Sequence, residues 1–251
     1  MILYNTRITS TFSGSCSSNS YQSSRDGAQA RYSRPFDVIQ DRLNPKRLIV
    51  SEYRGNALRA IDRDTRIAST IARNIVYPRF MTQATNGDIY LTAGHGIYKY
   101  HYKLSITELV AGSSTTQGYF DVGLDASRFY DPCGLIQLKG IDPDTFIVAD
   151  RGNNHVRVVD INQNRTMTLN LCRYGAYKFQ SWGLLSVCNL SNPEYMLLSG
   201  STLYLAESKG IKKFEGQFLR DIGSLDQHCL SEAGRLSPQY SNLQSYSENS
   251  L

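Results

Sequence analysis

The sequence predicts an all-β fold made of repeated units, and three observations lead to that prediction. Residues 146–149 and 155–159 belong to short runs that alternate in the way typical of antiparallel strands. Turns rich in glycine, asparagine and aspartate separate these runs. The chain also repeats itself at an offset of 98 residues. At 251 residues, 41% of them hydrophobic, it is long enough to bury a substantial core.

Two copies of a long unit can be followed along the chain. The segment 8–14 (ITSTFSG) matches 106–112 (ITELVAG), and 48–62 matches 146–160 at the same offset of 98 residues. Between these segments, Arg-Tyr and a following proline at 31–35 match Arg-Phe and a proline at 128–132, shifted by one residue. An offset that holds over fifty residues indicates a true internal repeat.

A shorter unit lies inside each copy. Residues 88–100 match 201–214, and both resemble the long unit with a turn two residues shorter. Four units are therefore present, with equivalent points at Val50, Leu91, Val148 and Leu205. A unit of about 40 residues with four short strands is the size of one β-propeller blade. We expect four recognisable blades near residues 33–72, 76–112, 130–172 and 190–223.

The third unit resembles a known family. The segment 150–157 (DRGNNHVR), preceded by Gly112 and by 126–132 (ASRFYDP), is similar to the NHL repeat. The resemblance covers about residues 8–223 and is best over 106–172. It implies an NHL-like β-propeller, a fold that commonly has six blades. It implies little about activity, because the shared residues shape turns and packing.

The hairpins of the two long units repeat the same turn and core residues. Glycine and asparagine at 152–154 and 55–56 tolerate the positive φ that such turns require. The apolar positions that follow these turns are expected to face the core between blades. They are Leu58, Ile61, Val156 and Val159.

The two ends of the chain flank the recognisable propeller. Residues 1–30 are expected to form an N-terminal strand and a serine-rich loop, and 224–251 a polar tail that resembles the start of a further blade. Two arrangements are open at this point: a truncated six-bladed ring, or a self-contained ring of four blades. An incomplete ring would leave open edges through which the chain could oligomerise.

Cysteines and glycosylation sequons favour an extracellular or secreted protein. The segment between Leu91 and Leu205 is sixteen residues longer than the repeat, and Cys172 and Cys188 bracket the insertion. A disulfide between them would contribute up to about 3 kcal/mol, and the alternative is two buried thiols. Asn164 and Asn189 begin N-glycosylation sequons. The chain starts without a recognisable signal peptide.

The sequence contains no arrangement that predicts catalysis. His-Glu-x-x-His, Gly-x-Ser-x-Gly and phosphate-binding glycine motifs are absent. The four histidines lie in unrelated contexts, and His95 and His155 are expected in hairpins. We therefore predict no catalytic residue, no metal ligand and no cofactor. A metal-dependent lyase or hydrolase remains the third interpretation.

Carboxylates and basic residues recur in equivalent hairpins and invite a structural interpretation. Groups that recur from blade to blade more often fix turns or ion pairs than perform chemistry. The three sets are Glu52 with Arg59, Asp150 with Arg157, and Glu207 with Lys212.

Binding is the better-supported function, because the basic residues are concentrated near the first unit. The net charge is +5, yet between positions 25 and 79 eleven arginines and one lysine accompany only six acidic residues. Arginine and aromatic side chains can hold an acidic protein or ligand, or RNA phosphates and bases. The candidates are Arg31, Arg34, Arg42, Arg47, Arg54, Arg59, Tyr32, Tyr53, Tyr98 and Tyr102.

The predicted function is a non-enzymatic interaction module that binds a protein or other extracellular ligand through propeller loops. RNA binding by the basic first blade is the alternative, and a merely solvated basic edge is equally compatible with the pattern. No apolar run approaches the roughly 18 residues of a membrane span.

Overall fold

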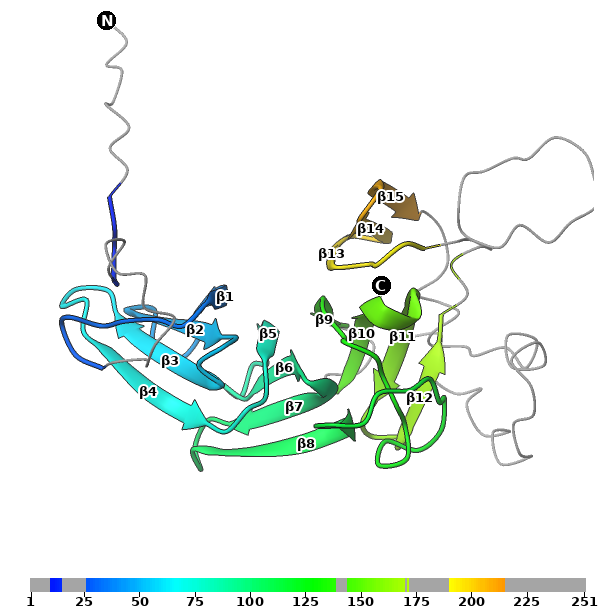
Figure 1. The fold of residues 1–251 in the computed structure, drawn as a ribbon, viewed down its shortest axis with the longest axis horizontal. Helices are drawn as coiled ribbons and strands as arrows, with labels where there is room; N and C mark the ends of the chain where they lie inside the picture. The colour runs from blue at the N-terminus through cyan, green and yellow to red at the C-terminus, as the bar shows by residue number, and fades with distance from the viewer. Residues whose placement is uncertain (1–9, 15–25, 139–143, 170, 172–189, 215–251) are drawn as a thin grey trace, which may run out of the picture. The chain divides into compact units, whose positions relative to one another are not determined.

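The computed structural model describes residues 10–14, 26–138, 144–169, 171 and 190–214. The described strands form four antiparallel sheets, so the predicted all-β fold is confirmed (Figure 1). In each sheet the strands follow one another in chain order, each paired with its sequence neighbour. Such consecutive hairpins arise where alternating strands are joined by tight turns.

The first two sheets have four strands each. The first is made of β1 (Pro35–Gln40), β2 (Arg47–Glu52), β3 (Ala57–Asp62) and β4 (Ala68–Arg73). The second is made of β5 (Pro78–Gln83), β6 (Ile89–Ala93), β7 (His95–His101) and β8 (Ile106–Ser113).

The third and fourth sheets follow the same meander. The third contains β9 (Leu135–Gln137), β10 (Thr145–Asp150), β11 (His155–Asp160) and β12 (Arg165–Thr168), with a short 3-10 turn, Arg151–Asn153, between β10 and β11. The fourth contains β13 (Tyr195–Ser199), β14 (Thr202–Glu207) and β15 (Gly210–Phe214) within the described residues.

Strand register supports the equivalence of the repeats. Val50 pairs with Arg59, Val148 with Arg157, and Leu205 with Lys212, each across the hairpin of its own sheet. An apolar residue and a basic residue therefore face each other at the same point of three sheets.

The chain divides into two compact structural units, each larger than one sequence repeat and here named the first unit and the second unit. The first contains Met1–Ile89 and Tyr100–Thr107, and the second contains Tyr90–Lys99 and Glu108–Leu251. Only the first unit has more basic than acidic residues. It has 14 basic and 7 acidic residues, whereas the second unit has 13 basic and 15 acidic residues.

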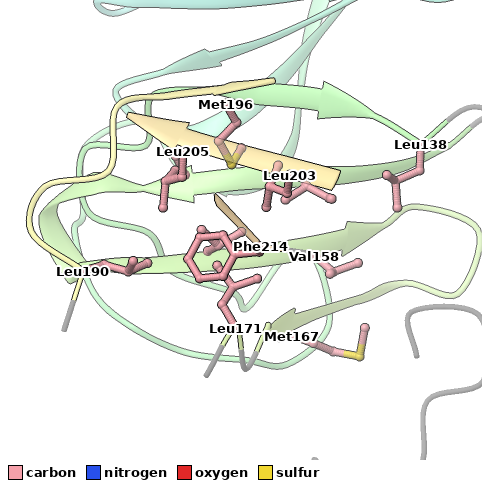
Figure 2. Close-up of a cluster of buried hydrophobic side chains, with 12 residues drawn as sticks. Leu138, Val158, Met167, Leu171, Leu190, Met196, Leu203, Leu205 and Phe214 are labelled. Carbon is pink, nitrogen blue, oxygen red and sulfur yellow. The ribbon is translucent and has the colours of Figure 1, made fainter. Parts of the chain in front are cut away.

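In the second unit, a hydrophobic cluster joins the third and fourth sheets. Figure 2 shows Met196, Leu203 and Leu205 of the fourth sheet beside Val158 of β11. Leu203 and Leu205 are fully buried, as a densely packed core requires. Burial of such side chains contributes about 1.5–3 kcal/mol each.

The four apolar hairpin residues expected to face the core between blades lie on both faces of their strands. Leu58, Ile61, Val156 and Val159 are all buried. Successive strand residues point to opposite faces, so Val156 and Val159, three apart on β11, cannot share a face. Val156 belongs to the same hydrophobic cluster as Val158, whereas Val159 pairs with Phe146 across the hairpin.

Candidate functional site

A carboxylate and a cation form an ion pair in one hairpin of each of three sheets: β2–β3, β10–β11 and β14–β15. This is one of the structural roles that their recurrence in the sequence predicts. The nitrogen–oxygen distances are 2.9 Å for Arg59–Glu52, 2.8 Å for Arg157–Asp150 and 3.1 Å for Lys212–Glu207.

Arg157 shows how completely such a cation is used by the fold. Its side chain is fully buried, and it donates to Asp150, to Asp121 Oδ1 at 2.7 Å and to the carbonyl of Phe120. Its guanidinium also lies 4.7 Å from the centre of the Phe129 ring. Burial raises the pKa of Asp150, against the opposing effects of Asn153 and Arg157. These contacts link the loop before β9 to the β10–β11 hairpin.

Arg59 occupies the equivalent position in the first unit. It donates to Glu52 and to Asp26 at 2.8 Å, and it lies 5.1 Å from the centre of the Tyr32 ring. The Arg59 side chain is fully buried, and Tyr32 is half-buried beside it. The guanidinium of Arg59 is therefore engaged by residues of the fold and is not presented to solvent.

A second network uses Arg47 and Tyr102. Arg47 Nε donates to Asp41 Oδ2 at 2.7 Å, and the guanidinium lies 5.1 Å from the Tyr102 ring centre. Asp41 is fully buried and also accepts from Gln83. Burial acts to raise the pKa of Asp41, but hydrogen bonds from Gln83, Leu43 and Arg47, with the Arg47 charge, lower it overall.

The remaining sequence candidates do not form one surface. Arg34, Tyr53 and Arg54 lie at the end of the first sheet where β1 begins, whereas Arg42 and Arg47 lie at the opposite end. The six residues of β1 separate these ends by about 17 Å.

Two further candidates have simple positions. Arg31 is exposed in the loop before β1, and its carbonyl accepts from Arg59. Tyr98 is buried in β7, so its side chain is likewise not presented to solvent.

Four aromatic rings gather where β1 and β5 begin, and we call them the aromatic cluster: Phe36, Tyr53, Tyr77 and Phe80. Tyr53 stacks on Tyr77 with ring centres 4.9 Å apart and on Phe36 at 5.9 Å. Phe36 meets Phe80 edge to face at 5.2 Å. These separations are those of favourable aromatic pairs. Phe36 and Tyr77 remain 36% and 45% exposed, so the cluster is open to solvent.

Two arginines pack on the central ring of this cluster. The guanidinium carbons of Arg34 and Arg79 lie 4.6 Å and 5.2 Å from the centre of the Tyr53 ring, within the range of cation–π attraction. Arg79 is buried, whereas Arg34 is exposed. No ion pair involves Arg34 within the described residues. An exposed cation is thus held beside exposed aromatic rings.

Backbone geometry helps to position the site. Arg34 and Tyr77 have φ of 55° and 51°, and each is followed by a proline. Asp131 and Asn192 repeat this arrangement, with φ of 55° and 48° before a proline. Non-glycine residues seldom adopt positive φ, so its recurrence marks an equivalent position at the start of each sheet.

Side chains from the preceding sheet cap three of these positions. Asn56 Oδ1 accepts the Tyr77 N–H at 3.0 Å, and Asn154 Oδ1 accepts the Asn192 N–H at 2.7 Å. His95 Nδ1 takes the same role for the Asp131 N–H at 3.1 Å. His95 therefore has a structural contact, and accepting at Nδ1 requires that this nitrogen be unprotonated.

The sequence predicts Arg34 and Tyr53 as binding residues, but it does not single out Phe36, Tyr77, Phe80 or Arg79. Aromatic residues are common in strands, so their number alone does not reveal a surface. The available signal was the repeated residue–proline pair, which places Arg34 and Tyr77 at equivalent points.

The other sequence-based candidates lie in separate parts of the chain. Among the described residues, no three histidine, cysteine, aspartate or glutamate side chains form a metal-binding group. His155 stacks on Tyr119 at 4.7 Å, and Cys133 is buried. Asn164 is exposed in the β11–β12 turn. Cys172, Cys188, Asn189 and residues 224–251 lie outside the described residues.

In the described part of the chain, no helix has the length and apolar character needed to cross a membrane.

Comparison with known proteins supports the fold. No protein-family model and no curated protein sequence matches the chain. A structural-genomics protein of unknown function from Bacteroides thetaiotaomicron VPI-5482 is similar with a TM-score of 0.55 at 17% identity, over 71% of this chain and 46% of that one. A structure of a nidogen/laminin complex gives a TM-score of 0.52 at 14% identity, over 74% and 65%.

These similarities assign the fold alone. The four antiparallel sheets are those of a β-propeller. This chain spans less than two thirds of the length of either matched chain.

Proposed function

We propose that this chain is a non-enzymatic interaction module, and that it binds a protein or other extracellular ligand through the aromatic cluster and Arg34. The observation that supports this most directly is the exposure of Phe36 and Tyr77 beside an arginine with no ion pair among the described residues. Tyrosine and arginine are the residue types that most often dominate binding energy at protein interfaces.

The nidogen similarity supports this function only at the level of fold. Nidogen is described in a complex with laminin, and there a propeller-containing protein has a protein partner. A rigid disc of sheets that presents loops at its faces is well suited to that role.

We also infer that the repeats are of the NHL type. Support comes from the Asp/Glu–Arg pair, the glycine-asparagine turn and the preceding Arg-aromatic segment, which recur in the two long units. The recurring buried contacts explain why these residues would be shared by a repeat that has no common activity.

An extracellular setting is the proposed location. The exposure of Asn164 is compatible with glycosylation, and the Cys172–Cys188 disulfide remains part of the proposal. Peptide mapping without reduction, on protein secreted from eukaryotic cells, tests both modifications. Free thiols at Cys172 and Cys188, with Asn164 and Asn189 unmodified, would remove the support for this location.

The binding function is tested with an array of purified secreted and cell-surface proteins. The biotinylated full chain should bind at least one protein saturably. The double variant Phe36→Ala/Tyr77→Ala should bind it at least tenfold more weakly, and Leu104→Ala, which removes another exposed apolar side chain, should bind it normally. Absence of saturable binding to every protein would contradict the proposed function.

RNA binding is the weaker alternative, for a geometric reason. Of the six predicted arginines, Arg47 and Arg59 are in ion pairs, and the others are divided between the two ends of the first sheet. A nucleic acid needs basic side chains that follow its backbone continuously.

A further inference from the structure

We propose that the aromatic cluster and Arg34 recognise a linear peptide segment of a partner protein, in which a carboxylate lies next to an aromatic or aliphatic side chain. Arg34 would bind the carboxylate, and Phe36 and Tyr77 would cover the apolar side chain. This inference rests on the proposed function and specifies the chemistry of its ligand.

The internal repeat shows that the fold does not require this cluster. Tyr53 directly follows the buried Glu52, just as Arg151 follows the buried Asp150. Arg34 and Asp131 are equivalent by their positive φ before a proline. In the second unit, these two positions form an Asp131–Arg151 ion pair. A polar pair at these two positions is therefore sufficient for the fold, whereas the first unit has a cation on an aromatic ring there.

The same comparison applies to Tyr77. Its equivalent in the fourth sheet is Asn192, which has the same backbone conformation and the same asparagine cap on its N–H. Asparagine adopts positive φ more readily than tyrosine does. The exposed tyrosine is thus unfavourable for the local backbone, and ligand binding gives it a role that local folding does not.

The exposed guanidinium of Arg34 also indicates the charge of the ligand. In the second unit Arg151 pairs with Asp131, whereas in the first unit Arg34 contacts a ring and has no carboxylate among the described residues. A ligand carboxylate can pair with Arg34, and a guanidinium binds carboxylates with two parallel hydrogen bonds. The 14 basic and 7 acidic residues of this unit favour an acidic ligand over a neutral one.

The small number of cations favours a peptide. Arg34 is the exposed cation in contact with the cluster, since Arg79 is buried. One guanidinium beside partly exposed rings fits one carboxylate beside one apolar group. Peptide segments combine these groups in neighbouring residues, whereas RNA presents a phosphate at every nucleotide.

The inference is tested by selecting a phage library of random 12-residue peptides on the immobilised full chain. We expect enriched peptides to share an aspartate or glutamate next to an aromatic or aliphatic residue. A synthetic copy of the most enriched peptide is then titrated against wild type and variants by fluorescence anisotropy. Arg34→Ala and Tyr77→Ala should each weaken its binding at least tenfold.

Matched variants control for charge and folding. Lys103→Ala removes an exposed cation from the same unit and should leave the peptide affinity within twofold of wild type. Arg34→Lys keeps the charge without the guanidinium and should weaken binding severalfold. Thermal melting of each variant establishes that it is folded before binding is measured.

The outcomes separate this inference from the proposed function. No peptide enrichment, peptides without a carboxylate, or binding insensitive to Arg34→Ala would overturn the peptide site. If the protein array still shows binding that Phe36→Ala/Tyr77→Ala abolishes, the proposed function stands with a different epitope. If single-stranded poly(U) alone binds, both proposals are wrong.

Discussion

At the scale of single residues, arginine has two different roles in this chain. Arg157 and Arg59 are fully buried, and their guanidinium groups connect a loop, a hairpin and an aromatic ring. Arg34 is exposed and contacts a ring without an acidic partner among the described residues. The buried residues stabilise the fold, because removing one partner leaves an uncompensated charge in the interior.

The buried pair Asp150–Arg157 gives the first prediction. Arg157→Met should lower the free energy of unfolding by about 3–5 kcal/mol, because it leaves the Asp150 carboxylate buried without its cation. Chemical denaturation measures the loss. Arg128→Met changes an arginine that is less buried and should cost less than about 1 kcal/mol. Equal losses in the two variants would contradict a special role for Arg157.

Asp41 gives a prediction about pH. Hydrogen bonds and the Arg47 charge lower its pKa in the folded state, so the unfolded state binds its proton first as the pH falls. The stability contributed by this carboxylate is complete above its unfolded pKa and is lost in acid. Asp41→Asn should therefore make the free energy of unfolding less dependent on pH between about pH 5 and pH 3.

Denaturation curves recorded across that pH range measure the effect. Asp125→Asn, which removes an exposed carboxylate, is the control for the substitution itself. If the free energy of unfolding of Asp41→Asn depended on pH as steeply as that of wild type, Asp41 would not be preferentially charged in the folded protein.

At the scale of elements, each sheet begins with the same conformation: a residue with positive φ followed by a proline. The N–H groups of Tyr77, Asp131 and Asn192 are accepted by side chains from the hairpin of the sheet before. The cap therefore adds a side-chain link between consecutive sheets within a unit, beside main-chain hydrogen bonds such as Gly134 N–H to the Glu194 carbonyl. Its side chains are Asn56, His95 and Asn154.

The caps give a prediction at this scale. Asn56→Ala and Asn154→Ala should each lower the free energy of unfolding by at least about 1–2 kcal/mol, because a main-chain N–H loses its acceptor and alanine replaces asparagine at a positive φ. Asn56→Asp keeps an acceptor oxygen and should retain most of the stability. Chemical denaturation compares the three variants, and an equal effect of Asn56→Asp and Asn56→Ala would show that the hydrogen bond is not the cause.

At the scale of the molecule, the charge of the chain is unevenly divided. The first unit has a formal surplus of seven positive charges, and the second unit has a deficit of two. Ion pairs with Asp41 and Glu52 neutralise Arg47 and Arg59, and the exposed arginines of the first sheet lie at opposite ends of its strands. Within the described part of this unit, the exposed arginines of the first sheet therefore do not form one continuous strip.

This distribution predicts weak RNA binding. A single strand of poly(U) at one end of the first sheet would meet about three cations, so the plot of log affinity against log salt should have a slope no steeper than about −2. Fluorescence titrations at a series of salt concentrations measure it. A slope of −4 or steeper would show that the basic residues act together and would restore the RNA interpretation.

Local and periodic patterns in the sequence are enough to predict the strands, the turns and the repeat. Alternation, glycine-asparagine turns and the offset of 98 residues are local or periodic properties, and they predicted the antiparallel sheets of a propeller. The recurrence of Glu52–Arg59 in Asp150–Arg157 likewise predicted a structural role. Such features need no knowledge of which segments meet in space.

Which candidate side chains are exposed depends on packing between segments that are distant in the chain. Phe36, Tyr53 and Tyr77 come from three separate segments, and their stacking follows from the pairing of β1 with β2 and from the packing of β5 beside them. Arg34, Arg47 and Arg59 look alike in the sequence, yet one is exposed and two are in ion pairs. Burial and pairing depend on neighbours distant in the chain, so composition predicted a basic region and only the fold distinguished its members.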